Sequence, residues 1–308
     1  MEEEFDKGLY TDQGVLFFHF LIKKHQWSSI TKEDYMRWSN NFSQIPDGQY
    51  IQARILNSLI YYSEDDMIRL LKDAIASIFE NDIVLPYLLE KSFSCLSSEL
   101  DYQVSAATKK TIIIPSIEDL HDPGSSGPEI IRDLRNHLMP QFDSAFSYNI
   151  SPNMEYESII IVDDCIGSGD QCKAFWEEAT IKGGTLLREW CKSKGIKAYY
   201  LTLIGYKEAV VDLRKLYPDL TIICAEFIDN RHQLFSDQSR CWKDSVEQSE
   251  ISNRLQTVLS EYGLSLRGYN NLSFAVALHK TIPDWSIPAL YKNKNGWQHL
   301  LERKNTYG

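Results

Sequence analysis

The segment Ile159–Gln171 reads IIIVDDCIGSGDQ and decides the predicted fold. It opens with a run of apolar, mostly β-branched residues, which is typical of a strand buried on both faces. Two acidic residues, Asp163 and Asp164, follow this run, and glycines then lead into a stretch with helical spacing. Ligands of open α/β sheets bind at the carboxyl ends of the strands. We therefore expect both carboxylates to lie at the ligand-binding edge of a sheet.

The turn after the two acids contains Gly167 and Gly169 on either side of Ser168. Glycines allow the backbone to fold tightly and to bring N–H groups close to an anion. The N-terminus of the following helix adds a favourable dipole and further donors. Carboxylates suit the hydroxyls of a sugar, and a turn lined by amides suits a phosphate. Together they predict a site for a ribose 5-phosphate group.

Further apolar runs alternate with helical stretches along the second part of the chain. This alternation predicts βαβ units and a parallel, doubly wound α/β sheet. The first hundred residues show helical spacing and no catalytic constellation. We therefore expect a helical region at 1–100 and an α/β domain at 101–308. The expected core strands are Thr111–Pro115, Ser158–Val162, Ala198–Ile204 and Leu220–Cys224, and two strand-like runs follow at Ser273–Leu278 and Ile287–Tyr291.

Composition narrows the function classes. The 308 residues include 32 basic and 43 acidic side chains, a net charge of -11, so direct binding to nucleic acid is not expected. The basic run at 182–197 is interpreted as the solvated side of a helix. Six cysteines without C-x-x-C spacing argue against a zinc site or a disulfide framework. The MEEEFD start does not resemble a signal peptide, and no apolar run is long enough for a membrane span. We expect a cytoplasmic protein without membrane contact.

Other families also place acids after an apolar strand. A Walker B strand needs an upstream G-x-x-x-x-G-K-[ST], and the nearest segment, Gly124–Glu129 (GSSGPE), lacks the lysine. A response-regulator receiver needs an aspartate at the end of a later strand, where this chain has Ile204–Lys207. A dinucleotide-binding turn has glycines directly after the strand, without paired acids. A capped helix start with incidental acids is the remaining structural alternative.

The segment resembles the PRPP-binding signature of type I phosphoribosyltransferases. This resemblance implies that Asp163 and Asp164 bind the ribose 2- and 3-hydroxyls of PRPP, and that Mg²⁺ is carried by the diphosphate. Gly167 stands where Thr, Ser or Ala is usual, and Gln171 stands where a threonine usually donates to the phosphate. The residues that the resemblance assigns to the 5-phosphate are Ile166, Gly167, Ser168, Gly169, Asp170 and Gln171.

A broader resemblance rests on three segments: Arg54–Leu71, the PRPP-like segment and Arg267–Tyr291. Together they are similar to phosphoribosyltransferase-like proteins of bacterial conflict systems. The resemblance implies a type I phosphoribosyltransferase-like core, a helical N-terminal region and a small C-terminal hood at about 260–308. It also implies a role in anti-phage defence, with partner proteins from the same operon.

A transferase of this kind needs a second anion pocket for pyrophosphate. The loop after the first core strand is the candidate, and a flexible loop with a helix cap explains it equally well. Neither this loop nor the flap at 141–157 contains Lys or Arg, although such enzymes commonly use mobile cations to stabilise the departing group. The loop residues in question are Gly124, Ser125, Ser126 and Gly127.

Two functional hypotheses follow. The first is an enzyme that binds PRPP or a related phosphoribosyl nucleotide with Mg²⁺ and transfers or removes a ribosyl-phosphate group. The second is a catalytically inactive nucleotide sensor or scaffold for partner proteins. Tyr206 and Lys207, at the end of the third core strand, and His279, in the hood, are candidates for contacts with an acceptor.

Overall fold

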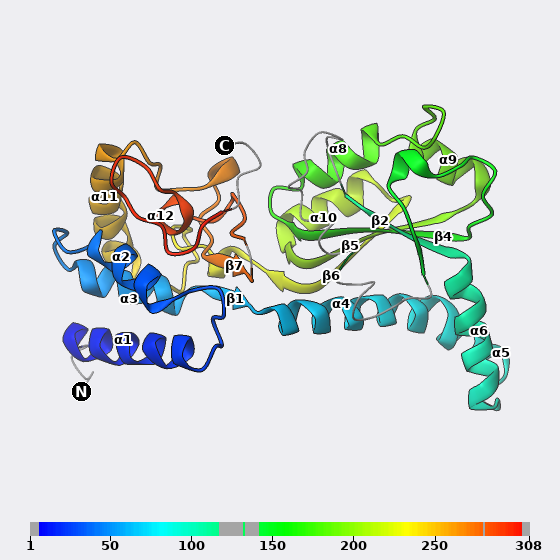
Figure 1. Cartoon of the computed structure of the whole chain (residues 1–308), viewed down its shortest axis with the longest axis horizontal. Coiled ribbons are helices and arrows are strands. Elements are labelled where there is room, and N and C mark those ends of the chain that lie inside the picture. The colour runs from blue at the N-terminus through cyan, green and yellow to red at the C-terminus, as the bar shows by residue number, and fades with distance from the viewer. Residues whose placement is uncertain (1–5, 117–131, 133–141, 280, 304–308) are drawn as a thin grey trace. The chain divides into compact units, whose positions relative to one another are not determined.

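The computed structural model describes residues 6–116, 132, 142–279 and 281–303 (Figure 1). The chain divides into two compact units, residues 1–67 with 228–305 and residues 68–227 with 306–308. This division differs from the expected boundary near residue 100. The difference arises because the short strand β1 (Ile60–Tyr62) pairs in parallel with β7 (Val276–Leu278). Pairing between segments so far apart in the sequence leaves no local signal.

The sheet unit contains five strands in the order β3-β2-β4-β5-β6. Strand β2 is parallel to both β3 and β4, and β4 is parallel to β5. This arrangement confirms the expected α/β class with a parallel sheet flanked by helices. The strands are β2 (Thr111–Pro115), β3 (Asp143–Ser144), β4 (Ser158–Ile166), β5 (Lys197–Tyr206) and β6 (Leu220–Ile228).

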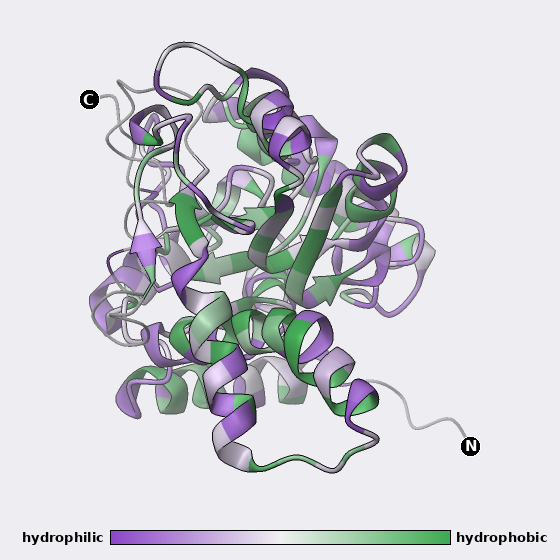
Figure 2. Ribbon diagram, turned by 90° about the vertical axis from the view of Figure 1, so that its right-hand side faces the viewer, coloured by the Kyte–Doolittle hydropathy of each residue, from purple (hydrophilic) through white to green (hydrophobic). Residues whose placement is uncertain are grey.

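Helices α8, α9 and α10 cover one face of this sheet (Figure 1). Trp176 of α8, Trp190 of α9 and Leu213 of α10 share a buried cluster with Ile159 and Ile161 of β4. Figure 2 shows the hydrophobic colour concentrated on the central strands. The described helices assigned here are α4 (Glu64–Phe79), which begins in the other unit, η1 (Glu80–Val84), α5 (Leu85–Glu90), α6 (Ser97–Lys109), η2 (Ser147–Asn149), α8 (Asp170–Glu178), α9 (Leu187–Lys194) and α10 (Lys207–Leu216).

The second unit is mainly helical, and its core includes Phe18, Trp38 and Trp297. The indole N–H of Trp38 donates to the Ala289 carbonyl at 2.7 Å. This hydrogen bond joins the two chain segments that form the unit. The strand expected at Ile287–Tyr291 is wrong: most of this run is a short helix, because a proline suits a first helical turn. The helices are α1 (Lys7–Lys23), α2 (Lys32–Asn40), α3 (Gly48–Asn57), η3 (Asn230–His232), α11 (Ser245–Glu261), η4 (Tyr269–Asn271) and α12 (Pro288–Tyr291).

None of the helices in the described ranges is long and apolar enough to cross a membrane.

Packing inside the sheet unit leaves no room for a side chain at Gly205 of β5. A Cβ atom there would lie 2.4 Å from the Cys224 sulfur. We expect Gly205→Ala to lower the free energy of unfolding by about 1–3 kcal/mol, the usual cost of overpacking a core. Urea unfolding measures this loss. Adding Cys224→Ala removes the clashing sulfur, so the double variant should lose less than the sum of the two single variants. Strict additivity would contradict the steric explanation.

Candidate functional site

The strand order places a topological switch point between β2 and β4. The chain leaves β2 toward β3 on one side of the sheet, and it leaves β4 toward β5 on the other. Ligands of open α/β sheets bind at such a point, at the carboxyl ends of the strands. Ser116, directly after β2, donates its backbone N–H to the Val162 carbonyl of β4 at 2.9 Å, so the end of β2 lies beside the residue that precedes the acidic pair. The acidic pair follows Val162 at this edge.

Strand β4 is longer than its apolar run indicated. It continues through Asp163 and Asp164 to Ile166, which pairs with Gly205 of β5. Asp163 is completely buried, and Asp164 is half-buried. The two acids are adjacent in the sequence, but the structure does not expose both carboxylates to solvent. The physical reason is that continued strand pairing carries Asp163 into the sheet interior.

Asp163 is held by a chain of buried hydrogen bonds. Its Oδ2 accepts from the Tyr200 hydroxyl at 2.6 Å, and its Oδ1 accepts from the Asp164 backbone N–H at 2.9 Å. The Tyr200 hydroxyl in turn lies 2.8 Å from the Ser116 Oγ. All three side chains come from neighbouring strands or their ends, and none is exposed to solvent. The network joins β2, β4 and β5 at the switch point.

Burial controls the charge of this network. Loss of solvation, followed by the nearby negative charge of Asp164, raises the pKa of Asp163 well above its ordinary value. Hydrogen bonds from Tyr200 and from the Asp164 backbone act in the opposite direction but are smaller causes. Burial likewise raises the pKa of Tyr200. Asp164 is the less buried member of the pair.

In the turn after β4, Gly169 has a backbone conformation that favours glycine. Gly169 adopts a φ of 89° and caps helix α8, where a Cβ would lie 3.0 Å from a methyl carbon of Leu213. The first N–H groups of a helix have no partner within the helix, and its dipole favours an anion there. Ser168 Oγ donates to the Asp170 carboxylate at 2.8 Å, so a negative side chain also stands at this helix start. Gln171 is half-buried behind it.

The other predicted residues lie in three places. The candidate pyrophosphate residues Gly124, Ser125, Ser126 and Gly127 fall outside the described residues. Tyr206 and Lys207 do lie at the carboxyl end of β5, as expected. His279 belongs to the other unit, where its Nδ1 lies 3.0 Å from Ser29 Oγ and 3.1 Å from Ser28 Oγ.

The sequence reasoning missed Tyr200 and Ser116. Tyr200 lies within an apolar strand run and Ser116 directly follows one. Their hydroxyl groups in such apolar surroundings were the only sequence feature that could have indicated a buried hydrogen-bond network. A buried tyrosine hydroxyl usually finds a hydrogen-bond partner, so a tyrosine in the middle of an apolar strand predicts a polar group beside it. Which group it contacts depends on the register between β4 and β5.

Within the described ranges, no group of three or more His, Cys, Asp or Glu side chains is placed to coordinate a metal ion. A metal that is carried by a diphosphate needs no such group.

Comparisons with known proteins identify the family of the chain. Residues 35–303 match the family described as PRTase-CE. Among solved structures, the AQ2163 protein from Aquifex aeolicus is 12% identical with a TM-score of 0.27; the match covers 40% of this chain and 56% of that one. Orotate phosphoribosyltransferase from Aeropyrum pernix is 13% identical with a TM-score of 0.25, over 54% of this chain and 77% of that one. No curated protein matches the chain. Because the family match spans most of the sequence, the chain belongs to the PRTase-CE family and is a phosphoribosyltransferase-like protein.

Proposed function

We propose that the protein binds PRPP or a related phosphoribosyl nucleotide, together with Mg²⁺, at the carboxyl end of β4. The observation that carries this proposal is the meeting of three features at one switch point: the half-buried Asp164, the glycine turn at 167–169 and the N-terminus of α8. A carboxylate beside a backbone anion site suits a sugar that carries a phosphate. The family match supports the same ligand class.

In this proposal the two acids have different roles. Asp164 accepts hydrogen bonds from the ribose hydroxyls, and its charge offsets positive charge that develops on the ring. Asp163 fixes the backbone of Asp164 through the 2.9 Å hydrogen bond to its N–H. The turn and the α8 N-terminus bind the 5-phosphate and thereby position the reacting carbon. Mg²⁺ neutralises the diphosphate when it is bound.

The proposed reaction transfers or removes the ribosyl-phosphate group at C1. A non-catalytic nucleotide sensor or scaffold is the second candidate, and the acidic flap favours it. The flap segment 142–157 holds Asp143, Glu155 and Glu157 and no Lys or Arg, so it offers no cation to a departing pyrophosphate. The sequence resemblance to conflict-system proteins supports a role in anti-phage defence, with partner proteins, for either candidate.

One experiment separates the two candidates. The full chain is titrated calorimetrically with Mg-PRPP, and pyrophosphate release is then measured with a panel of nucleobases or water as acceptor. Saturable binding with release of pyrophosphate supports the enzyme. Binding without release supports the sensor.

The control for this experiment is Glu178→Gln, which removes one exposed charge from the far end of α8 and should leave both signals unchanged. Absence of binding to PRPP, to phosphoribosyl nucleotides and to ribose 5-phosphate would overturn the proposal.

A further inference from the structure

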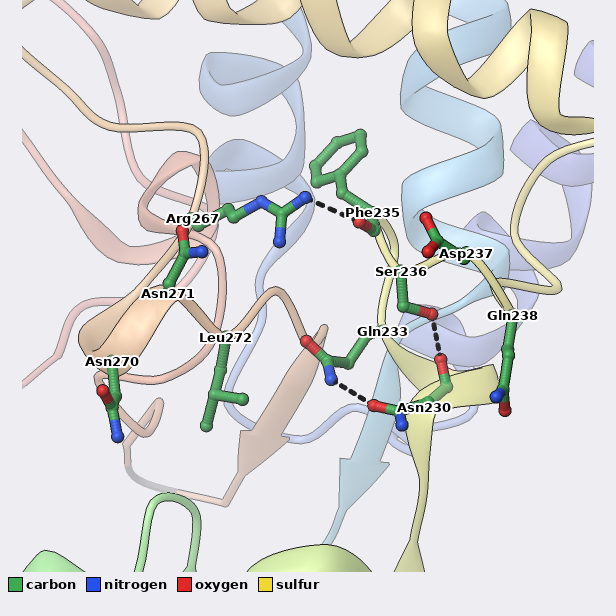
Figure 3. Close-up of a pocket in the computed structure, with 10 residues that line it drawn as sticks. All are labelled: Asn230, Gln233, Phe235, Ser236, Asp237, Gln238, Arg267, Asn270, Asn271 and Leu272. Carbon is green, nitrogen blue, oxygen red and sulfur yellow. Dashed lines mark hydrogen bonds between the residues drawn. The ribbon is translucent and has the colours of Figure 1, made fainter.

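A cavity lies in the unit formed by residues 1–67 and 228–305, and no residue of β4 lines it (Figure 3). Its volume is about 370 Å³, within the range of small-molecule sites. Two loops line it, one at 230–238 and the other at 267–272. The second loop begins the segment Arg267–Tyr291, which is one of the three segments that carry the family resemblance. The proposed phosphoribosyl site uses no residue of this segment.

The loop at 267–272 carries a cation. One terminal nitrogen of the half-buried Arg267 donates to the Phe235 carbonyl at 2.7 Å, as Figure 3 shows. Within the part of the chain that the structure describes, this is the only hydrogen bond or ion pair of its side chain. A guanidinium offers five N–H donors in a fork that matches a carboxylate or phosphate, so most of them remain for a ligand.

The opposite loop contributes an anion. Asp237 is exposed and lines the same cavity, and among the described residues it has no hydrogen-bond or ion-pair partner. Arg267 and Asp237 therefore lie around one cavity without pairing with each other. A ligand that carries both a negative and a positive group complements the two walls.

Uncharged amides fill most of the remaining lining. Gln233 donates to the Asn230 side-chain oxygen at 2.8 Å and accepts from Ser273, so it forms a fixed part of the wall. Asn271 and Gln238 also line the cavity, and their side-chain amides have no hydrogen-bond partner in the described ranges. Such a polar lining excludes lipids and other apolar ligands and suits a ligand with its own polar side chain.

The loop that carries Arg267 is rigidly placed. The Gly268 N–H donates to the Leu272 carbonyl at 2.7 Å, and the Tyr269 N–H donates to the Asp284 carbonyl at 2.8 Å. A Cβ at Gly268 would lie 2.3 Å from the Ser286 carbonyl oxygen, so the backbone packs directly against the neighbouring segment. A preorganised wall lowers the entropic cost of binding.

We propose that this cavity binds a small zwitterion, an α-amino acid with a polar side chain. The ligand carboxylate pairs with Arg267, its ammonium pairs with Asp237, and its side chain lies among the carboxamides. A nucleotide fits less well because it would bring only negative charge to the Asp237 side. The proposal does not depend on phosphoribosyl binding, because the two sites share no residue.

The test uses the full chain and three related probes in calorimetric titrations. L-glutamine carries both charged groups, N-acetyl-L-glutamine lacks the ammonium, and L-glutamine α-amide lacks the carboxylate. We expect L-glutamine to bind about tenfold or more tightly than either blocked probe, since each blocked probe loses one charged hydrogen-bonded contact. Asp237→Asn should weaken L-glutamine by a similar factor and leave the N-acetyl probe unchanged.

Arg267→Gln should conversely weaken L-glutamine and leave the α-amide unchanged. Because this change also removes the bond to Phe235, Asp237→Asn, whose side chain has no described partner, is the decisive variant. Glu250→Gln, an exposed charge on α11, is the matched control. Equal binding of all three probes, no binding of L-glutamine, or binding of a nucleoside monophosphate in its place would overturn the proposal.

Discussion

Asp164→Asn is expected to weaken PRPP binding by about 100-fold. A hydrogen bond to a charged group contributes about 1.5–3 kcal/mol, and 2.7 kcal/mol corresponds to a factor of about 100 in Kd. The residue is half-buried near the end of β4, and the amide keeps the shape of the side chain but loses its charge and replaces one acceptor oxygen with an NH2 donor. Calorimetry with Mg-PRPP measures the effect, and thermal unfolding checks that the fold is intact.

A second substitution near the proposed phosphate site should have the opposite effect to Asp164→Asn. Asp170→Asn removes a neighbouring charge that repels phosphate at the α8 start, so it should keep or improve the affinity. If the proposed defence role is correct, cells carrying Asp164→Asn should lose protection from phage, whereas Glu178→Gln should retain it. Unchanged PRPP affinity in Asp164→Asn would remove the central residue of the proposed site.

Asp163→Ala is expected to destabilise the fold by about 2–4 kcal/mol. The change leaves a small cavity and removes the acceptor of the completely buried Tyr200 hydroxyl. Asp163→Asn should cost far less, because its amide can donate to the Tyr200 oxygen while that hydroxyl turns toward Ser116. Urea unfolding of the two variants beside the wild type measures the difference. Equal losses in both variants would contradict the hydrogen-bond network.

The difference in stability between the wild type and Asp163→Asn is expected to depend on pH. The pKa of Asp163 is raised in the folded state, so the native protein keeps this proton at pH values where the unfolded chain has released it. The stability that Asp163 contributes is therefore complete below its ordinary pKa and is lost as the pH rises toward the raised value. In that window the stability of the wild type relative to Asp163→Asn should fall by up to about 1.4 kcal/mol per pH unit. A difference that rises with pH would mean that Asp163 is ionised in the fold.

Local patterns in the sequence predicted the α/β class, which the structure confirms, and the place of the proposed site. The β-branched run Ile159–Val162 favours a buried strand, and Gly167 and Gly169 allow the turn that begins α8. These features depend on neighbouring residues alone. They therefore predict the carboxyl end of β4 as the ligand edge of the proposed site, and the family match shows that the chain is phosphoribosyltransferase-like.

The tertiary structure distinguishes the two acids of the proposed site. Asp163 and Asp164 are equivalent in the sequence, but pairing between β4 and β5 continues past them and brings Tyr200 onto Asp163. Burial then separates their charges, because removal of water penalises an ionised carboxylate. Strand register is set by packing across the sheet and is not encoded in any single segment.

Tertiary contacts also bring the N-terminal and C-terminal segments into one compact unit. The β1–β7 pair and the cavity between the loops of Arg267 and Asp237 each join residues that are distant in the sequence. Local spacing and side-chain chemistry predicted the buried core strands and the proposed ligand edge, but they missed β1 and indicated a strand where α12 lies. Only the folded chain determined the unit boundary, the buried network and the charged cavity, since these depend on which distant surfaces exclude water from one another.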